Sequence, residues 1–144
     1  MTDFYVYDLS EHCGWDFQET GRIGGVDDLA DYWQKPGHWA FLIRADERLA
    51  GFACVRRLRE NPTPLYDVGE FFVVRKYRRR GVGRHVAREL FTRFAGEWQV
   101  RELIDNAPAT RFWRRVIGEI TAGRFAEATE QTDDGPQVVQ RFNT

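Results

Sequence analysis

The sequence has little cysteine and no long apolar run, and each shortage excludes a class of protein. Its two cysteines, Cys13 and Cys54, are far apart and belong to no CxxC pair, so neither a disulfide framework nor a metal site is expected. No apolar stretch approaches the ~20 residues that a membrane span requires. The first residues also lack the basic start and apolar stretch of a signal peptide. We therefore expect a cytoplasmic protein with no metal and no membrane partner.

Linkers, internal repeats and low-complexity tracts are also absent from the 144 residues. A chain of this length can bury roughly 68–70% of its unfolded surface around one core, and it needs no structural metal or disulfide to do so. We expect residues 1–144 to form a single domain.

Positive charge is concentrated in one segment of an otherwise acidic chain. Residues 75–93 contain eight Lys or Arg and one acid, Glu89, which gives that segment a net charge of +7 within a chain of formal net charge −1. The remaining residues therefore carry −8. A non-specific nucleic-acid binder usually has a basic domain. The distribution favours a small polyanionic ligand and no nucleic-acid partner.

Successive segments show the apolar period of a strand or of a helix. Two apolar runs flank a polar turn in residues 38–58, which is typical of a β-hairpin, and residues 66–74 end in an apolar run expected at the centre of a sheet. Residues 81–95 have apolar positions at helical spacing. We also expect helices at 26–33 and 109–120, a strand at 98–104, a terminal hairpin around Asp134-Gly135, and either a strand or, preferably, a helix at 4–9. This order predicts a mixed α/β domain.

Two glycines, Gly81 and Gly83, precede the helix expected from residue 81. Closely spaced glycines before a helix leave backbone N–H groups unpaired, and with the helix dipole these groups form an anion site. The stretch lacks the GxxxxGK[ST] pattern of a P-loop and the third glycine of the dinucleotide fingerprint. The segment is therefore predicted to bind a phosphate group of another kind of ligand.

The run Arg78-Arg79-Arg80-Gly81-Val82-Gly83 resembles the Gln/Arg-x-x-Gly-x-Gly/Ala motif of the GNAT acetyltransferase superfamily. Residues 106–118 resemble a second block of that superfamily, Asn-x-x-Ala-x-x-aromatic-aromatic, and details of both blocks resemble a bacterial branch of it. The resemblance covers residues 66–118. It implies an α/β fold with a mixed central sheet, flanked by helices, whose fourth and fifth strands splay apart. Such relatives are expected to have a strand and most of a helix ahead of this chain's first residue, so a missing N-terminal strand is one interpretation.

The resemblance further implies that acetyl-CoA is the cosubstrate and lies between the splayed strands. The backbone of one strand would pair with the pantetheine arm, at Phe72, Val73, Val74 and Arg75. The Val74 N–H would face the thioester carbonyl and stabilise the oxyanion formed there. The pyrophosphate would rest on the N–H groups of the loop, with arginine side chains assisting, at Arg79, Arg80, Gly81, Val82, Gly83 and Arg84. In the second block, Ala109 is the motif alanine, and Asn106 either bonds the pantetheine amides or forms a turn.

Transfer to an amine also requires an acid and a base. An amine arrives protonated, so a base must accept its proton. Glu70 is the best candidate, because apolar neighbours could raise its pKa, although it could equally be a solvated strand end. Asp67 is the reserve. The tyrosine that usually protonates the leaving thiolate is replaced by Trp113, which cannot act as an acid at neutral pH. Trp113 then either packs in the core or contacts CoA, and Tyr77 could serve as the acid instead.

The implied function is transfer of an acetyl group from acetyl-CoA to an amine of a small molecule or peptide, by direct attack in a ternary complex. The alternative, motivated by Trp113, is a non-catalytic domain that binds or senses acetyl-CoA. A set of aromatic residues could form the acceptor pocket or part of the core: Trp15, Phe17, Tyr32, Trp33 and Trp39. His85 is expected at the surface, and the protein is expected to be a monomer or homodimer.

Overall fold

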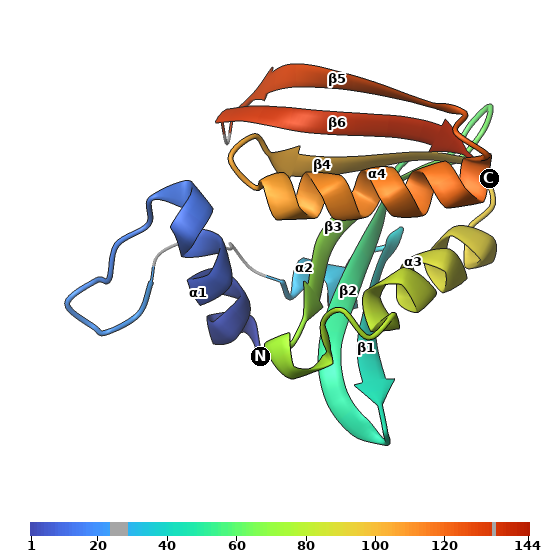
Figure 1. Cartoon of the computed structure of the whole chain (residues 1–144). Helices are drawn as coiled ribbons and strands as arrows, with labels where there is room; N and C mark the ends of the chain where they lie inside the picture. The colour runs from blue at the N-terminus through green and yellow to red at the C-terminus, as the bar shows by residue number, and fades with distance from the viewer. Residues whose placement is uncertain (24–28, 134) are drawn as a thin grey trace.

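The computed structural model describes residues 1–23, 29–133 and 135–144 of the chain. Within them, strands form one mixed sheet in the order β1-β2-β3-β4-β6-β5, as Figure 1 shows. The strands are β1 (His38–Ala45), β2 (Arg48–Arg59), β3 (Leu65–Val73), β4 (Glu97–Leu103), β5 (Phe125–Thr132) and β6 (Gly135–Asn143). The helices are α1 (Thr2–Cys13), α2 (Asp31–Gln34), the 3-10 turn η1 (Arg75–Tyr77), α3 (Val82–Arg93) and α4 (Ala107–Thr121).

The element order agrees with the sequence prediction. The first hairpin turns at Asp46 and Glu47, both with positive φ, and the helix preferred for residues 4–9 is part of α1. The helix expected at 26–33 is confirmed only in its last part, as α2, because residues 24–28 lie outside the described residues. Asp134 also lies outside them, although the terminal hairpin on either side of it is present as β5 and β6. The mixed α/β fold class is confirmed.

The strands predicted to splay are β3 and β4. They pair in parallel only from Leu65↔Glu97 to Val68↔Val100. Beyond that point β3 stays paired with β2 as far as Val73, and β4 stays paired with β6 as far as Leu103. The two strands therefore diverge while each keeps one hydrogen-bonded neighbour, and a V opens in the middle of the sheet (Figure 1).

Each face of the sheet is covered by its own apolar cluster. The larger cluster lies under α3 and α4 and contains Phe91, Trp98 and Ile117. The smaller cluster lies under α1 and α2 and contains Tyr5, Tyr32 and Phe72. Because successive side chains of a strand point to opposite faces, Phe71 and Val73 of β3 join the first cluster, while Phe72 joins the second. The sheet therefore separates an α3/α4 face from an α1/α2 face, and the V is an opening between them. None of the helices in the described part of the chain has the length and apolar composition of a bilayer span.

Strands β2 and β3 approach closely at Gly51, where a Cβ would lie 1.9 Å from the carbonyl oxygen of Phe72. Because that neighbour is backbone, Gly51→Ala must displace β3 beside the V, and we expect a loss of about 1–3 kcal/mol in the free energy of unfolding. Gly118→Ala in α4 is the control, because its Cβ would meet nothing nearer than 3.9 Å. Alanine there should instead stabilise the helix by roughly 0.5–1 kcal/mol. Urea denaturation of both variants measures the difference, and equal stabilities would contradict the close approach.

Candidate active site

A cavity of about 820 Å³ occupies the V between β3 and β4. Its walls include Gly69 and Glu70 of β3, Glu102 of β4 and Asn106 at the start of α4. Tyr5, with Leu9 and His12, brings α1 to the same opening. The cavity therefore joins β3, β4 and the second block of the sequence resemblance to the N-terminal helix, while none of residues 78–83 lines it.

The backbone of β3 has one edge bonded to β2 and the other edge facing the V. The Val74 N–H donates to the carbonyl oxygen of Ala50 at 2.8 Å, so it points to β2. Because the bonded positions of an antiparallel pair alternate, Phe71 and Val73 direct their N–H and C=O groups to the V. The oxyanion role predicted for the Val74 N–H is therefore corrected, since that donor is already engaged.

The glycine-rich loop leaves several N–H groups open at the start of α3. Gly81 is the N-cap with φ 83°, and no side chain caps the helix. Among the described backbone bonds, the first one back to the cap runs from the His85 N–H to the Gly81 carbonyl oxygen, at 2.9 Å. The N–H groups of Val82, Gly83 and Arg84 thus lie at the unsatisfied end of the helix. This geometry fits an anion such as a phosphate.

The second glycine has a packing reason as well. A Cβ on Gly83 would lie 3.3 Å from the ring of Phe112 and 3.5 Å from that of Phe71. The sequence argument considered only the approach of phosphate oxygens. Gly83 also lets the first turn of α3 pack closely against β3 and α4.

The arginines around the loop divide into two groups. Arg75 and Arg78 both form ion pairs with Asp8 of α1, and the Nε of Arg78 donates to the Val73 carbonyl oxygen at 2.6 Å. The Arg75 side chain thus holds α1 against the end of β3, and the contact of its backbone with the pantetheine arm stays a prediction.

The other arginines remain close to the loop. Arg84 lies 3.5 Å from Glu119, and Arg80 lies 3.9 Å from Asp46. Arg79 has a positive φ of 58° and no ion pair with any described residue. Of the predicted cationic contacts, Arg79 and Arg80 are therefore the most available to an anion.

Glu70 points from β3 toward α1, where its carboxylate accepts a hydrogen bond from the Tyr5 hydroxyl. Burial raises the pKa of Glu70, and the Tyr5 bond and the Arg56 charge lower it in part, leaving a net upward shift. The same burial raises the pKa of the Cys54 thiol to about 12. A carboxyl group in this environment has the properties of a general base and lies in the cavity wall.

Asp67, the reserve base, occupies a different environment. Its side chain has no solvent exposure. Arg56 donates to it at 2.7 Å, Gln99 at 3.0 Å and Arg101 at 3.2 Å. Arg56 belongs to β2, and Gln99 and Arg101 belong to β4, so this carboxylate links β3 to both neighbours. Asp67 is therefore placed to hold the strands together and, unlike Glu70, does not line the cavity.

The residues of the second block have structural contacts. The Asn106 side-chain oxygen accepts a hydrogen bond from the Ala109 N–H at 3.2 Å and caps α4. This contact agrees with the turn-forming alternative, and Asn106 also lines the cavity.

Trp113 is only 5% exposed. Its ring contacts Phe71 edge-on at 5.0 Å between centroids, which agrees with packing in the core, and it also lines the cavity.

The aromatic residues proposed for an acceptor pocket do not come together. Trp15 and Tyr32 line the cavity. Trp39 packs on Phe94 with centroids 4.7 Å apart, while Phe17 and Trp33 are 67% and 65% exposed. Two of the predicted set therefore belong to the site.

Two further residues considered from sequence lie away from the cavity. Tyr77 is buried in the larger cluster and does not line the cavity. His85 is exposed on α3, as expected.

Sequence reasoning missed Glu102 of β4. This residue is 5% exposed and lines the cavity, and both carboxyl oxygens lack a hydrogen-bond partner among the described residues. Burial, with a contribution from Glu127, raises the pKa of Glu102 to about 8, against an opposing effect of Arg114. The alternation of residues 98–104 already placed this acid on the face of Trp98 and Val100, which is the pattern that could have revealed it.

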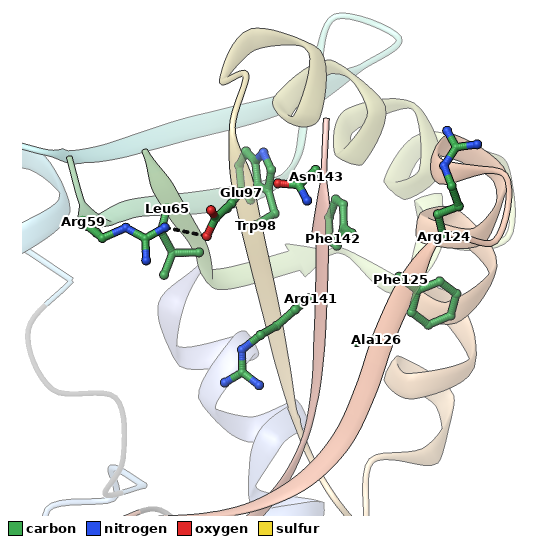
Figure 2. Close-up of a pocket in the computed structure, with 10 residues that line it drawn as sticks. All are labelled: Arg59, Leu65, Glu97, Trp98, Arg124, Phe125, Ala126, Arg141, Phe142 and Asn143. Atoms are coloured by element: carbon green, nitrogen blue, oxygen red, sulfur yellow. Dashed lines mark hydrogen bonds and ion pairs between the residues drawn. The ribbon is translucent and has the colours of Figure 1, made fainter. Parts of the chain in front are cut away.

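A second hollow of about 520 Å³ lies where β3 and β4 begin. Figure 2 shows Arg59 and Glu97 pointing toward one another there, with 2.5 Å between the guanidinium and the carboxylate. None of the residues predicted for the site lines it. Nor does any group of three or more His, Cys, Asp or Glu in the described residues have an arrangement that could hold a metal ion.

Comparisons with known proteins agree with this geometry. The family model described as "Acetyltransferase (GNAT) family" matches residues 6–118, whereas a search of curated protein sequences gives no match.

Solved structures share the fold at low sequence identity. A protein described as a streptothricin acetyltransferase from Bacillus anthracis, in complex with acetyl coenzyme A, has a TM-score of 0.63 and 14% identity over 83% of this chain and 70% of its own. The ribosomal-protein-S18-alanine N-acetyltransferase from Escherichia coli has a TM-score of 0.57 and 19% identity over 99% and 88%. Naa50 from Arabidopsis thaliana, in complex with the bisubstrate analogue CoA-Ac-MVNAL, has a TM-score of 0.57 and 15% identity over 73% and 72%.

The splayed sheet, the open helix start after Gly81 and a family match that covers most of the chain lead to one assignment. This protein belongs to the GNAT acetyltransferase family.

Proposed function

We propose that this protein transfers the acetyl group of acetyl-CoA to an amine of a small molecule or peptide, by direct attack in a ternary complex. The observation that carries the proposal is the edge of β3 that has no partner strand. This edge faces a cavity lined by Glu70, Glu102 and the start of α4. The family relationship supports acyl transfer in general. The Naa50 complex and the S18-alanine enzyme support a peptide or protein amine as one class of acceptor.

Acetyl-CoA would bind on the α3/α4 face of the V. Its pyrophosphate would accept hydrogen bonds from the N–H groups of Val82, Gly83 and Arg84, with Arg79 and Arg80 as charged donors. The pantetheine arm would extend β3 along the edge formed by Phe71 and Val73, in the manner of an added strand. Asn106 and Ala109 would flank the arm from α4.

The acceptor would approach from the α1/α2 face, where Glu70 lies. Glu70 would accept the amine proton, and the nitrogen would attack the thioester carbon. The Phe71 N–H would then bond the oxyanion, in place of the engaged Val74 N–H. Loss of one such donor costs about 2.7–4 kcal/mol in other acyl-transfer enzymes, so this single backbone group would have a large share in the rate.

A domain that binds acetyl-CoA without turnover is the second candidate. The observation that favours it is Trp113, whose indole cannot protonate a leaving thiolate. The two candidates differ in one measurement, because only the transferase releases CoA thiol in proportion to an added amine.

Charge reversal at the loop tests the cofactor site. Acetyl-CoA at 100 times its Kd should stabilise the wild-type protein by about 2.7 kcal/mol. In the double variant Arg79→Glu/Arg80→Glu the affinity should fall at least about tenfold, because hydrogen bonds to charged groups contribute roughly 1.5–3 kcal/mol each. Thermal unfolding with and without acetyl-CoA and CoA measures the effect. Arg111→Glu, exposed on α4, is the control and should bind normally; equal affinity in all three proteins would contradict the placement of the phosphates.

Hydrogen exchange tests which edge of β3 binds the pantetheine arm. The Val74 N–H is bonded to Ala50 and should be protected with or without ligand. The Phe71 and Val73 N–H groups face the V and should gain protection only when acetyl-CoA is added. Residue-resolved amide exchange by NMR measures both classes. Ligand-dependent protection at Val74 alone would restore the original assignment.

Replacement of the proposed base tests the chemistry. Glu70→Gln should lower kcat about 10²–10⁴-fold. Because the pKa of Glu70 is raised, the wild-type kcat/KM should fall with decreasing pH already above the ordinary range of a glutamate, and the variant should lose this acidic limb. In Tyr5→Phe the bond that lowers the pKa is removed, so the limb should move to higher pH. Glu89→Gln on the exposed face of α3 is the control, and an unchanged pH profile in Glu70→Gln would remove Glu70 as the base.

A further inference from the structure

Glu102 lies on β4 where the V opens. It lies two residues beyond Val100, the last position of β4 that pairs with β3, and it remains paired with Val138 of β6. Its side chain shares a face with Trp98 and Val100, both in the cluster covered by α3 and α4. The backbone is therefore held by β6, while the carboxyl group lies at the cavity on the side of the sheet where the glycine-rich loop begins α3.

The environment of Glu102 contains little that could balance a negative charge. Glu127 of β5 and Arg114 of α4 are the charged groups that act on it. These two are already bonded to each other at 2.5 Å, and Gln140 of β6 donates to Glu127 at 2.8 Å. Two further acids line the same cavity, Asp105 and Asp133. Burial beside Glu127 therefore keeps Glu102 a neutral carboxylic acid at neutral pH, with its pKa at about 8.

The two carboxyl groups in the wall of the cavity lie on opposite faces of the sheet. Glu70 is bonded to Tyr5 of α1, whereas Glu102 lies on the face covered by α4. The attacking nitrogen and the departing sulfur are separate substituents of the tetrahedral carbon, so their protons can be handled by two different groups. The cavity has one carboxyl group on each face of the sheet.

We propose that Glu102 is the acid that protonates the departing CoA sulfur, which rests on the transferase function proposed above. The amine nitrogen, whose ammonium form has first lost one proton to solvent, bonds to the thioester carbon, and Glu70 accepts the second proton that this nitrogen loses and later returns it to solvent. When the tetrahedral intermediate collapses, the carbon–sulfur bond breaks and its electron pair goes to sulfur. The Glu102 hydroxyl proton passes to that sulfur, and the Glu102 carboxylate regains a proton from solvent.

The other proton donors near the cavity are less suitable. Tyr5 and His12 belong to α1, on the acceptor face, and the Tyr5 proton is already donated to Glu70. Tyr77 is in the core and outside the cavity wall. Trp113 lines the cavity without an ionisable proton at neutral pH. On the α3/α4 face, Glu102 has the acidic proton that the reaction requires.

The variant Glu102→Gln tests the role, because the amide keeps the size of the neutral acid and cannot give up a proton. With acetyl-CoA and an amine that the wild type accepts, kcat should fall about 10²–10⁴-fold at neutral pH, and the Kd of acetyl-CoA should stay within about twofold. The wild-type kcat should fall as pH rises through about 8, and the variant should lose this basic limb. A structural role would not move the limb.

Glu127→Gln provides a second, independent test. Loss of the Glu127 charge lowers the pKa of Glu102, and the released Arg114 lowers it further, so the basic limb should move to lower pH.

The pH dependence of stability gives a third test that does not require turnover. The pKa of folded Glu102 is above its unfolded value, so its contribution to stability is complete below about pH 4.5 and is lost as pH rises to about 8. As pH rises from about 4.5 to about 8, the Tm of wild type should therefore fall relative to that of Glu102→Gln, which lacks this titration.

The outcomes separate the two proposals. If the wild type is active and Glu102→Gln keeps both the rate and the basic limb, the role of Glu102 is overturned. The transferase function then stands. A wild type that binds acetyl-CoA but releases no thiol with any amine overturns the transferase function and the acid with it. If Glu102→Gln does not fold, an unshifted limb in Glu127→Gln overturns the proposal.

Discussion

The structure depends on the end of pairing between β3 and β4 after Val68 and Val100. Each strand keeps its outer neighbour, so neither is free to collapse into the gap, and each presents one edge without a partner strand, on which Arg78 engages the Val73 carbonyl oxygen. Unpaired backbone groups removed from water cost free energy unless a partner satisfies them. An extended ligand with amide groups of its own is such a partner, which is why the same feature that interrupts the sheet also defines the kind of molecule that fits there.

The vertex of the V is held by the buried carboxylate of Asp67. In register it faces Arg56 on β2 and Gln99 on β4, and it bonds both of these side chains and Arg101. Three strands are thus tied together one residue before the pairing ends. Removing one member of a buried ion pair typically costs 3–5 kcal/mol. A charged group considered as a reserve for catalysis thereby links the strands next to the point where they divide.

Local pattern was enough to predict the elements, the glycine-rich loop and the start of α4, because periods, glycines and the Asn106 cap are properties of neighbouring residues. The edge of β3 that faces the ligand was not predictable in this way. It depends on the register with β2, which shifts between Cys54 and Val55, so the available N–H became that of Phe71 rather than Val74. The ion pair of Arg75 could not be predicted for a similar reason, since its partner Asp8 lies 67 residues away.

Glu70 and Glu102 show how one gap can give two glutamates different chemistry. Tyr5 and Arg56 both stabilise the charged form of Glu70 and limit the rise in its pKa. Glu102 has no hydrogen-bond donor among the described residues and a negative neighbour, so its neutral form is favoured. Glu70 faces α1 and Glu102 faces α4, so each carboxyl group meets a different set of neighbours. The environments that separate their pKa values are those that acid–base chemistry on a bound thioester requires.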